Sequence, residues 1–558
     1  MPSATPGAPT AAAIEADFII VGAGFSGCLA LHELRRQGYS AKILEAASDF
    51  GGVWHANRYP GVRVDSETPL YQLGMPKVWD SFSFTQRFPG GDELRRYFAH
   101  LDETLHLRKD TLFHARVCRA ERDSASNTWS FVTESGLTAT SRYAVFAAGT
   151  TNKPHRPAYP NIDSFKGTVL HPAAWPEDVN VQGKRVGVVG QGATGVQIVQ
   201  ELAKEDCHLD VFVRNPCIAI PMGQRQIPPR ESEEMKNLNE GLFFKAKYLS
   251  NGGFAHNDSL GPFHSQSKKE RLEQYERMWS RGGFAFLLGV YRDYGVNREA
   301  NAEMYSFWAS KTRTRLADPV KRDIVAPLEQ FQWFGTKRPS LEMDYYEMLD
   351  RPNVSLVDLK STPIREFSET GVVTSDGKEH ALDVVVLATG YDSVTGSLYD
   401  MNIHDEDGVL LQERWRDGIK TYVGMMAPGF PNAFFLYGPQ APTSLVNGPP
   451  FLELQVEWIT ELLQRAKEDD VQSLAVSAEA ADGWTEASWQ VFRSVLHHET
   501  DSWWTGANIP GKNREPLIWF GGLRSWWNEC SEALKDWSKF AVRDQLATHT
   551  ETSASERE

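Results

Sequence analysis

The sequence is poor in cysteine and contains no closely spaced cysteine pair. Five cysteines occur among 558 residues. Without a CxxC motif, a redox dithiol and a cysteine-based zinc site both lack their usual spacing, and we expect no metal site. Sparse, scattered thiols are typical of proteins in a reducing compartment, so we expect a cytoplasmic location.

Long apolar runs and an excess of positive charge are also missing. The longest apolar runs, such as FAFLLGVY at 284–291, are far shorter than a bilayer span, so we expect no membrane span. The net charge of −15 argues against nucleic acid as the main partner. Residues 1–16 lack the basic region of a signal peptide and are interpreted as a flexible leader. Residues 541–558 are interpreted as a polar tail.

What is present fits a globular protein of more than one domain. The hydrophobic content is 41% and the charged content 23%, which is ordinary for a folded chain. A chain of 558 residues is longer than one hydrophobic core normally serves, so at least two domains are expected.

Residues 17–27, DFIIVGAGFSG, combine a short apolar run with a glycine-rich turn. The run predicts a buried parallel strand, and Gly22, Gly24 and Gly27 have GxGxxG spacing before a predicted helix. The next predicted strand, AKILE, ends at Glu45, about 20 residues further on, where a ribose-binding carboxylate belongs. The pattern predicts a dinucleotide whose pyrophosphate lies on a helix N-terminus. The acid favours a free ribose hydroxyl, hence FAD or NAD rather than NADP; the alternative is a tight turn without a ligand.

A second turn of the same kind occurs at residues 183–195, GKRVGVVGQGATG. Gly190, Gly192 and Gly195 repeat the spacing between a predicted strand and a predicted helix. Here the following strand, LDVFV, ends in Arg214, whose guanidinium can bind a 2′-phosphate. We therefore expect NADPH at this turn, although Arg214 could also be a solvated residue at a strand end.

The two turns together predict hydride transfer from NADPH to a bound flavin. The stretches VFAAGT at 145–150 and VVVLATGYD at 384–392 are each interpreted as a strand that ends in a turn of small residues. Such strands can return the chain to the flavin domain after an excursion. Their order predicts that the second nucleotide fold is inserted into the first.

Two longer motifs give the chain a family resemblance. The motif FxGxxxHxxxW followed by Pro is matched by Phe165, Gly167, His171, Trp175 and Pro176. The motif GGxWxxxxYPGxxxD is matched by Gly51, Gly52, Trp54, Tyr59, Pro60, Gly61 and Asp65. With both glycine turns, these motifs make residues 17–522 resemble a Baeyer–Villiger monooxygenase, a class B flavoprotein monooxygenase.

The resemblance implies an α/β fold with two Rossmann-like domains, the NADPH domain inserted into the FAD domain, and a small helical insertion. The implied divisions are an FAD-binding domain at 17–155 and 384–540, an NADPH-binding domain at 156–224 and 334–383, and a helical insertion at 225–333. In this family the stretch around His171 links the two nucleotide domains, and His171 orients the linker. A satisfied structural histidine in a turn is the alternative interpretation.

The implied reaction uses NADPH and O2 and inserts one oxygen atom next to a ketone carbonyl, through a C4a-peroxyflavin, to give an ester or lactone. The family's essential arginine lies in a KRP context, which corresponds to Arg338, and Asp65 corresponds to a carboxylate that tunes it. A fixed cation near the peroxide is worth about 3–4 kcal/mol, by analogy with an oxyanion-hole donor. Without the resemblance, KRP is merely a basic surface turn.

The predicted catalytic residues are Arg338 and Asp65, and the resemblance extends the cofactor sites beyond the glycines. The residues expected near FAD are Gly22, Gly24, Phe25, Ser26, Gly27, Glu45, Gly52, Val53, Trp54, Asp65, Tyr71 and Val117. Those expected near NADPH are Gly190, Gln191, Gly192, Ala193, Thr194, Gly195, Gln197, Arg214, Asn215, Lys337, Arg338 and Trp503. Lys337 is expected to help bind the 2′-phosphate, and Trp503 lies in a stretch, DSWWTGANIPGK, that resembles a mobile family loop.

The substrate is expected to be a hydrophobic ketone. Residues 438–451, GPQAPTSLVNGPPF, correspond to a family region that lines the substrate pocket and carry no charge, which favours a large or cyclic ketone. The nearest alternative is an N- or S-oxygenating flavin monooxygenase, and a different class is a catalytically silent, redox-sensing flavin module. A disulfide reductase is disfavoured because no close cysteine pair exists.

Overall fold

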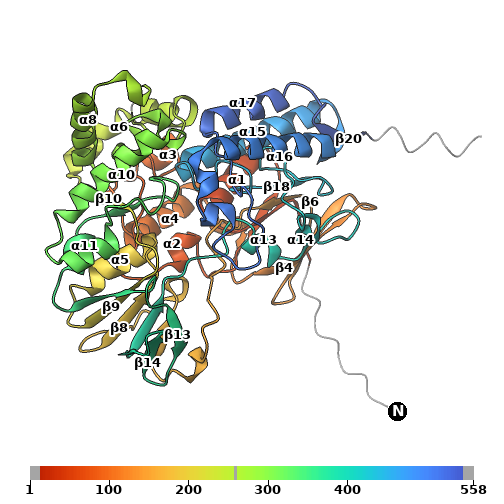
Figure 1. Cartoon of the computed structure of the whole chain (residues 1–558). Coiled ribbons are helices and arrows are strands. Elements are labelled where there is room, and N and C mark those ends of the chain that lie inside the picture. The colour runs from red at the N-terminus through yellow and green to blue at the C-terminus, as the bar shows by residue number, and fades with distance from the viewer. Residues whose placement is uncertain (1–12, 257–260, 545–558) are drawn as a thin grey trace, which may run out of the picture.

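The computed structural model describes residues 13–256 and 261–544, which form two lobes built on separate sheets (Figure 1). The sheet of the first lobe runs β17 (Ile403–His404), β4 (Val117–Asp123), β5 (Thr128–Thr133), β6 (Thr138–Phe146), β1 (Ile14–Val21), β2 (Ala41–Leu44), β3 (Thr111–Leu112), with β18 (Ala433–Phe435) also paired to β6. Strand β1 pairs in parallel with both β2 and β6. The first glycine turn therefore follows a central strand.

Helices cover this sheet on the side of α1 (Phe25–Arg36). They are α4 (Gly91–Leu105), α15 (Gly448–Glu468), α16 (Ala478–Ser494) and α17 (Leu523–Ala533), and Figure 1 shows the last three grouped above α1. Phe18 of β1, Leu31 of α1 and Trp458 of α15 belong to one buried cluster. The N- and C-terminal parts of the chain thus build one core.

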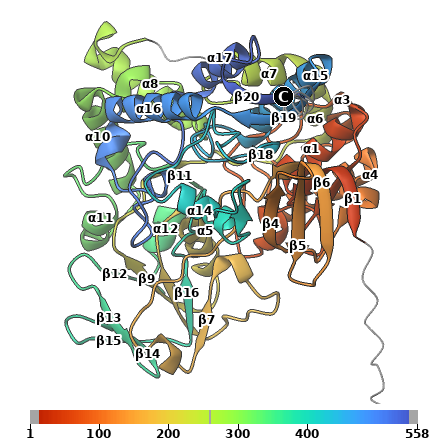
Figure 2. The same ribbon diagram turned by 90° about the vertical axis from the view of Figure 1, so that its right-hand side faces the viewer.

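The second lobe has a parallel sheet with the order β12 (Val354–Asp358), β9 (His208–Val213), β8 (Arg185–Val189), β16 (Val384–Leu387), β7 (Thr168–Leu170). Strand β8 lies in its centre between β9 and β16 and leads into α5 (Ala193–Leu202). Figure 2 shows this sheet beside and below the first one. The arrangement repeats the strand, glycine turn and helix of the first lobe.

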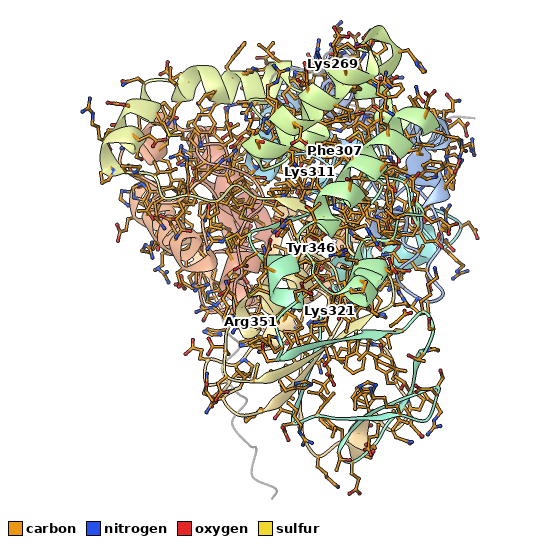
Figure 3. The ribbon with its side chains drawn as sticks, turned by 60° about the vertical axis from the view of Figure 1, so that its left-hand side comes forward. Lys269, Phe307, Lys311, Lys321, Tyr346 and Arg351 are labelled. Atoms are coloured by element: carbon orange, nitrogen blue, oxygen red, sulfur yellow. The ribbon has the colours of Figure 1, made fainter. Side chains whose placement is uncertain are left out.

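Residues 225–333 contribute a group of helices; those from residue 268 onward pack on the second lobe, whereas residues 243–248 contact the first. They are α6 (Pro229–Lys236), α7 (Asn239–Phe244), α8 (Lys268–Arg281), α9 (Ala285–Leu288), α10 (Arg298–Arg313) and α11 (Pro319–Val325), with a π-helical turn at Lys245–Leu249. Local signals fix their ends: Ser267 and Glu270 form a capping box at the start of α8. Figure 3 shows α8 and α10, marked by Lys269 and Phe307, above α12 (Tyr345–Leu349), marked by Tyr346.

Smaller sheets complete the fold. Strand β10 (Ala219–Pro221) pairs in parallel with β11 (Ser340–Glu342), on either side of the helical segment in the sequence. Strands β13 (Ile364–Phe367), β14 (Gly371–Thr374) and β15 (Glu379–Ala381) form an antiparallel sheet, and β19 (Val471–Val476) pairs with β20 (Phe540–Asp544). The remaining short helices are α2 (Val53–Ala56), α3 (Pro76–Trp79), α13 (Gly396–Tyr399) and α14 (Leu411–Arg414).

The predicted fold class is confirmed, because the strands of the second sheet lie in the sequence between β6 and β17 of the first. One strand, however, was predicted to belong to the wrong sheet. Strand β16 was expected to return the chain to the first lobe, but it pairs with β8 and β7 of the second. A wholly apolar strand such as VVVL suits the interior of either parallel sheet, so its sequence does not select one.

Both stretches predicted to be flexible ends contain residues that belong to strands. Strand β1 begins at Ile14, within the stretch interpreted as a leader, and its first residues pair with Ala139 and its neighbours. Strand β20 extends to Asp544, within the stretch interpreted as a polar tail. Backbone pairing with strands far away in the sequence outweighs the composition of both stretches. The rest of the leader, residues 1–12, and of the tail, residues 545–558, lies outside the described residues.

Candidate functional site

The first glycine turn is shaped by close backbone contacts. Gly22 has φ +108°, and a Cβ there would lie 2.6 Å from the carbonyl oxygen of Ala147, at the end of β6. A Cβ on Gly27 would lie 1.9 Å from the carbonyl oxygen of Gly22. Both positions therefore require glycine, and the turn brings the start of α1 against the carboxyl edge of the sheet.

A cavity of about 900 Å³ opens at this edge of the first sheet. The predicted residues that line it are Gly22, Gly24, Phe25, Ser26, Glu45, Gly52, Val53, Trp54, Tyr71 and Val117. Gly24 and Gly52 lie against each other in its wall, since a Cβ on Gly52 would lie 3.2 Å from the Cα of Gly24. The structure thus brings together residues from several separate segments, whereas Gly27 and Asp65 are not among the residues that line the cavity.

Glu45 directly follows β2, and its side chain is buried beneath the turn. Its Oε2 accepts a hydrogen bond from the backbone N–H of Ala23 at 2.5 Å, and its Oε1 accepts one from Ala47 at 2.7 Å. A carboxylate has about four lone-pair directions, so capacity remains for a ligand hydroxyl. Glu45 therefore both fixes the turn and faces the cavity.

An aromatic pair forms another part of the wall. The indole Nε1 of Trp54 donates to the hydroxyl oxygen of Tyr71 at 3.1 Å, with the rings edge to face at 5.7 Å. Burial raises the pKa of Tyr71, so this hydroxyl stays protonated. The pair is a rigid, uncharged surface suited to a large planar ring.

The last third of the chain supplies part of the wall that the sequence did not assign to it. Tyr437, Ser444 and Pro449 line the cavity beside Tyr71. Residues 438–451 were expected to line the ketone pocket, yet part of this segment faces the dinucleotide-sized cavity. The small-residue turn after β6 also lines it, through residues 147–150. Glycine and alanine after a buried strand were the available signal for that turn.

The second glycine turn has the same geometry as the first. Gly190 has φ +111°, and its Cβ would lie 2.3 Å from the carbonyl oxygen of Ala388 at the end of β16. A Cβ on Gly195 would lie 2.2 Å from the carbonyl oxygen of Gly190. Gly192 and Ala193 are exposed, and a Cβ on Gly192 would meet open space. The start of α5 is thus accessible to an anion.

Two residues predicted to bind NADPH have side chains that are hydrogen-bonded to other groups of the protein. The amide oxygen of Gln191 accepts a hydrogen bond from the hydroxyl of Tyr345, and its Nε2 donates to Gly190 at 2.9 Å. The amide of Gln197 is bonded to Tyr59 and to the backbone of Arg63. These partners lie 154 and 138 residues away from Gln191 and Gln197, which explains why the motif alone did not reveal them.

Two cations face one another beyond this turn. Arg214 and Asn215 follow β9 directly and are exposed, while Lys337 is partly buried. Burial and then the positive charge of Arg214 lower the pKa of Lys337. Within residues 13–256 and 261–544, neither cation has a carboxylate at ion-pair distance, although the negative charge of Asp501 acts on Lys337. A pair of cations without a direct ion-pair partner suits a phosphate.

Trp503 lies in a segment that is packed rather than free. Its ring is 5.3 Å from that of Trp504 and is partly buried against the core of the first lobe. The same segment is tied down by Asn508, which donates to the carbonyl of Tyr391 at 2.9 Å, and by Lys512, which donates to Asp392 at 2.7 Å. In this structure the segment predicted to be a mobile loop is therefore held by several contacts.

Arg338 and Asp65 form a doubly hydrogen-bonded ion pair between the lobes. Arg338 Nε donates to Oδ2 at 2.6 Å and Nη2 donates to Oδ1 at 3.0 Å, while Nη1 donates to the carbonyl of Ser444 at 3.1 Å. Burial acts to lower the pKa of Arg338, but the charge of Asp65 and its hydrogen bonds outweigh this and raise it. The guanidinium also lies over the ring of Phe284, at 4.6 Å. The guanidinium of Arg338 therefore stays protonated, and its orientation is fixed by these contacts.

His171 is bonded to the backbone on both ring nitrogens. Nδ1 accepts from the N–H of Ala173 at 3.2 Å, so Nε2 carries the proton and donates to the carbonyl of Gly390 at 3.2 Å. Burial lowers the pKa of His171, which favours this neutral form. The hydroxyl of Tyr391, the next residue, donates to Asn57 in the first lobe at 3.2 Å. His171 is therefore a structural contact near the crossing between the lobes.

Disulfide and metal chemistry find no support in the described residues. All five cysteines are free thiols. In the part of the chain that the structure describes, no group of three or more His, Cys, Asp or Glu side chains is arranged to hold a metal ion. None of the helices there combines the length and apolar character needed to cross a lipid bilayer.

Comparison with known proteins gives a consistent result. Residues 16–217 match the family model described as flavin-binding monooxygenase-like. The chain is 35% identical over 529 residues to a cyclopentanone 1,2-monooxygenase of Comamonas, covering 94% of this chain and 96% of that protein. It is 34% identical over 544 residues to a Baeyer–Villiger monooxygenase of Pseudooceanicola batsensis, covering 96% and 98%. A crystal structure of OTEMO in complex with FAD and NADP superposes with a TM-score of 0.90 at 30% identity, covering 95% of this chain and 99% of that one.

Proposed function

This chain belongs to the Baeyer–Villiger monooxygenase family, and we propose which of its residues carry out the reaction. The protein is an NADPH- and O2-dependent flavin monooxygenase that inserts one oxygen atom next to a ketone carbonyl and gives an ester or lactone. The assignments below rest on the geometry of its own side chains.

The cavity of the first lobe fits FAD. The two closely packed glycines, Gly24 and Gly52, allow a close backbone approach, and α1 begins beside them. Glu45 is placed to accept a ribose hydroxyl, and the Trp54–Tyr71 pair offers a surface for a planar ring. FAD supplies the redox chemistry and the activation of oxygen when it is bound. The chain's residues hold it and exclude water.

The second lobe binds NADPH at the start of α5. Arg214 and Lys337 bind the 2′-phosphate. The electrostatic repulsion between the two cations is relieved when the negatively charged phosphate binds. NADH lacks this phosphate, so the pair selects NADPH. Thr194 and Asn215, which are accessible near the turn, and Trp503 complete the proposed surroundings of the coenzyme.

Arg338 stabilises negative charge on oxygen and on the adduct with the ketone. A permanently protonated guanidinium does this without giving up a proton, unlike a lysine. Asp65 sets its direction through two hydrogen bonds, and Ser444, which also lines the cavity, receives a third. A fixed donor of this kind contributes about 3–4 kcal/mol to the transition state.

The stretch around His171 joins the two nucleotide domains and positions the crossing through Gly390 and Tyr391. We divide the chain into an FAD domain at 17–155, which resumes after β16, an NADPH domain that includes β16, and a helical insertion at 225–333. The free cysteines support a cytoplasmic location. An uncharged wall at residues 438–451 supports a hydrophobic ketone as substrate.

The Asp65–Arg338 pair beside the cavity is the observation that carries this function. The test is product analysis after incubation of the holoenzyme with NADPH, O2 and a panel of linear, monocyclic and fused-ring ketones, together with a sulfide and a tertiary amine. We expect ester or lactone formed in step with NADPH oxidation. Oxidised sulfide or amine without any ester would favour the N- or S-oxygenating alternative. NADPH left unconsumed would favour the redox-sensing alternative.

A further inference from the structure

Helix α5 carries two buried glutamines on the same side. Gln197 is 7% exposed and Gln200 is 2% exposed. Residues three apart on a helix are neighbours on its surface. The helix begins at the second glycine turn, so both side chains are held at a fixed distance from the proposed NADPH site.

Gln197 fastens a segment of the first lobe to α5. Its Oε1 accepts from the hydroxyl of Tyr59 at 3.0 Å, and its Nε2 donates to the carbonyl of Arg63 at 2.9 Å. Between them, Gly61 has φ +81°, and a Cβ there would lie 2.8 Å from the carbonyl oxygen of Gln197. The ring of Tyr59 is buried in the hydrophobic core of the second lobe. Residues 59–63 are therefore docked on α5.

This docked segment leads directly to the partner of Arg338. Asp65 lies two residues beyond Arg63 in the sequence. The intervening Val64 is held by a hydrogen bond from its N–H to the carbonyl of Pro89 at 3.1 Å. Because the connection is short and bonded, the place of the Asp65 carboxylate follows from the contact of residues 59–63 with α5.

Gln200 fastens the segment that carries Arg338. Its Oε1 accepts from the backbone N–H groups of Met343 at 2.7 Å and of Asp344 at 3.2 Å. These residues follow β11, which begins two residues after Arg338 and is paired with β10. The arginine segment is therefore anchored to the same helix as the aspartate segment.

We propose that α5 positions the Asp65–Arg338 pair, with Gln197 and Gln200 as the positioning residues, so that the cation has a fixed place relative to the second glycine turn. One glutamine holds each half of the ion pair, and neither needs to touch a cofactor or substrate. A displacement of about 1 Å at a reacting centre can cost about a hundredfold in rate, so such anchoring matters for catalysis. The catalytic part of this inference rests on the proposed function.

The test compares Gln197→Met and Gln200→Met with Gln274→Met in the holoenzyme. Methionine keeps the length of the side chain but removes its amide. Gln274 is a matched control, because it is buried on α8 and its Nε2 donates to the carbonyl of Gly289 at 2.6 Å, remote in sequence from both anchored segments. Three quantities are measured: ester formed per NADPH consumed, the Kd of NADP+ by calorimetry, and hydrogen–deuterium exchange of peptides that cover residues 62–66 and 338–344.

We expect the ester yield per NADPH to fall about tenfold in both α5 variants, as the arginine loses its fixed direction. The Kd of NADP+ changes less than about twofold, because β8 and the sheet still hold the glycine turn. Exchange rises at 62–66 in Gln197→Met and at 338–344 in Gln200→Met. Gln274→Met keeps the yield and the exchange of both peptides.

Several outcomes would overturn the inference. Unchanged exchange in both peptides would show that the glutamines do not anchor them, whatever the enzyme's reaction is. A raised Kd of NADP+ with an intact ester yield would make Gln197 a coenzyme contact instead. If Gln197→Met fails to fold, Tyr59→Phe removes one of its hydrogen bonds and is expected to show the same changes more weakly. A wild-type enzyme that forms no ester would count against the proposed function, while the exchange data would still decide the anchoring.

Discussion

The guanidinium of Arg338 and the carboxylate of Asp65 meet through two hydrogen bonds, of 2.6 and 3.0 Å, although 273 residues separate them in the sequence. A third N–H of the arginine is bonded to the carbonyl of Ser444. An arginine has five N–H groups, so within the described structure two remain for an anionic partner. Asp65 and Ser444 thus hold the guanidinium in place, and its remaining N–H groups are available to an anion.

Replacing Arg338 with alanine is expected to separate the two halves of the reaction. Reduction of the flavin by NADPH continues, because the coenzyme site around Arg214 is intact. Ester formation falls about 10²- to 10³-fold, as expected for loss of one preorganised charge. Stopped-flow absorbance under nitrogen measures the first step, and chromatography of the ester measures the second.

Arg338→Lys provides the control for this prediction. Lysine keeps a positive charge but cannot form the two-pronged contact with Asp65. We expect activity between those of the wild type and Arg338→Ala. An alanine variant that formed ester at the normal rate would remove the role assigned to Arg338.

Replacing Arg214 with alanine is expected to weaken the preference for NADPH over NADH about tenfold or more, since a hydrogen bond to a charged group contributes about 1.5–3 kcal/mol. The ratio of kcat/KM for the two coenzymes is the measurement. Arg185→Ala is the control, because this exposed arginine pairs with Asp383 at the opposite, amino-terminal end of β8. Equal relative use of both coenzymes in wild type and Arg214→Ala would contradict the phosphate assignment.

Affinity for NADP+ is expected to depend on pH through Lys337. Burial and the charge of Arg214 lower its pKa, so the lysine loses its proton at a lower pH than the usual value of about 10.4. Only the protonated form attracts the phosphate, so the affinity falls as the pH rises through this lowered pKa. In Arg214→Ala the fall moves to higher pH. Calorimetric titration with NADP+ and with NAD+, which lacks the phosphate, measures the effect; a pH-independent ratio of the two constants would speak against it.

Stability is expected to depend on pH through His497. Its ring packs against Trp504 and Phe520, and burial lowers its pKa to about 4. An unfolded chain binds this proton near pH 6.5, so the free energy of unfolding decreases as the pH falls from about 6.5 to about 4. Between pH 7 and pH 5 the expected loss is about 2 kcal/mol.

Urea unfolding of His497→Gln at these two pH values checks the prediction. The variant is expected to lose less stability on acidification than the wild type, by about the same amount. His264→Gln, at an exposed histidine, is the control. Equal pH dependence in wild type and His497→Gln would disprove the contribution of His497.

The glycine turns and the main strands around them could be predicted from sequence because local steric requirements specify them. Gly22 and Gly190 have positive φ and lie against backbone oxygens of the neighbouring strand, so their spacing carries structural information. The sheet to which β16 belongs could not be predicted, since its apolar residues suit either core. The first residues of β1 and the whole of β20 also escaped prediction, because their partners are remote in sequence.

The candidate site likewise contains some features that the sequence predicts and others that it does not. Glu45 and Trp54 lie beside the cavity as their motifs indicate, and Arg338 meets Asp65 as the resemblance implies. The side chains of Gln191 and Gln197 are instead engaged by Tyr345 and Tyr59, which no motif connects to them. Patterns within one segment reveal what that segment requires of its backbone, whereas contacts between distant segments emerge only from the fold.

The burial of Tyr59 inside the second lobe affects how this enzyme can be recombined with its relatives. A chimera joined at the crossing between lobes would pack residues 59–63 of one protein against the α5 helix of another. Exchange of the coenzyme-binding half therefore has to include residues 59–63, although they lie in the other half of the gene. The natural unit of exchange is defined by this interlocking contact and not by the order of the domains along the chain.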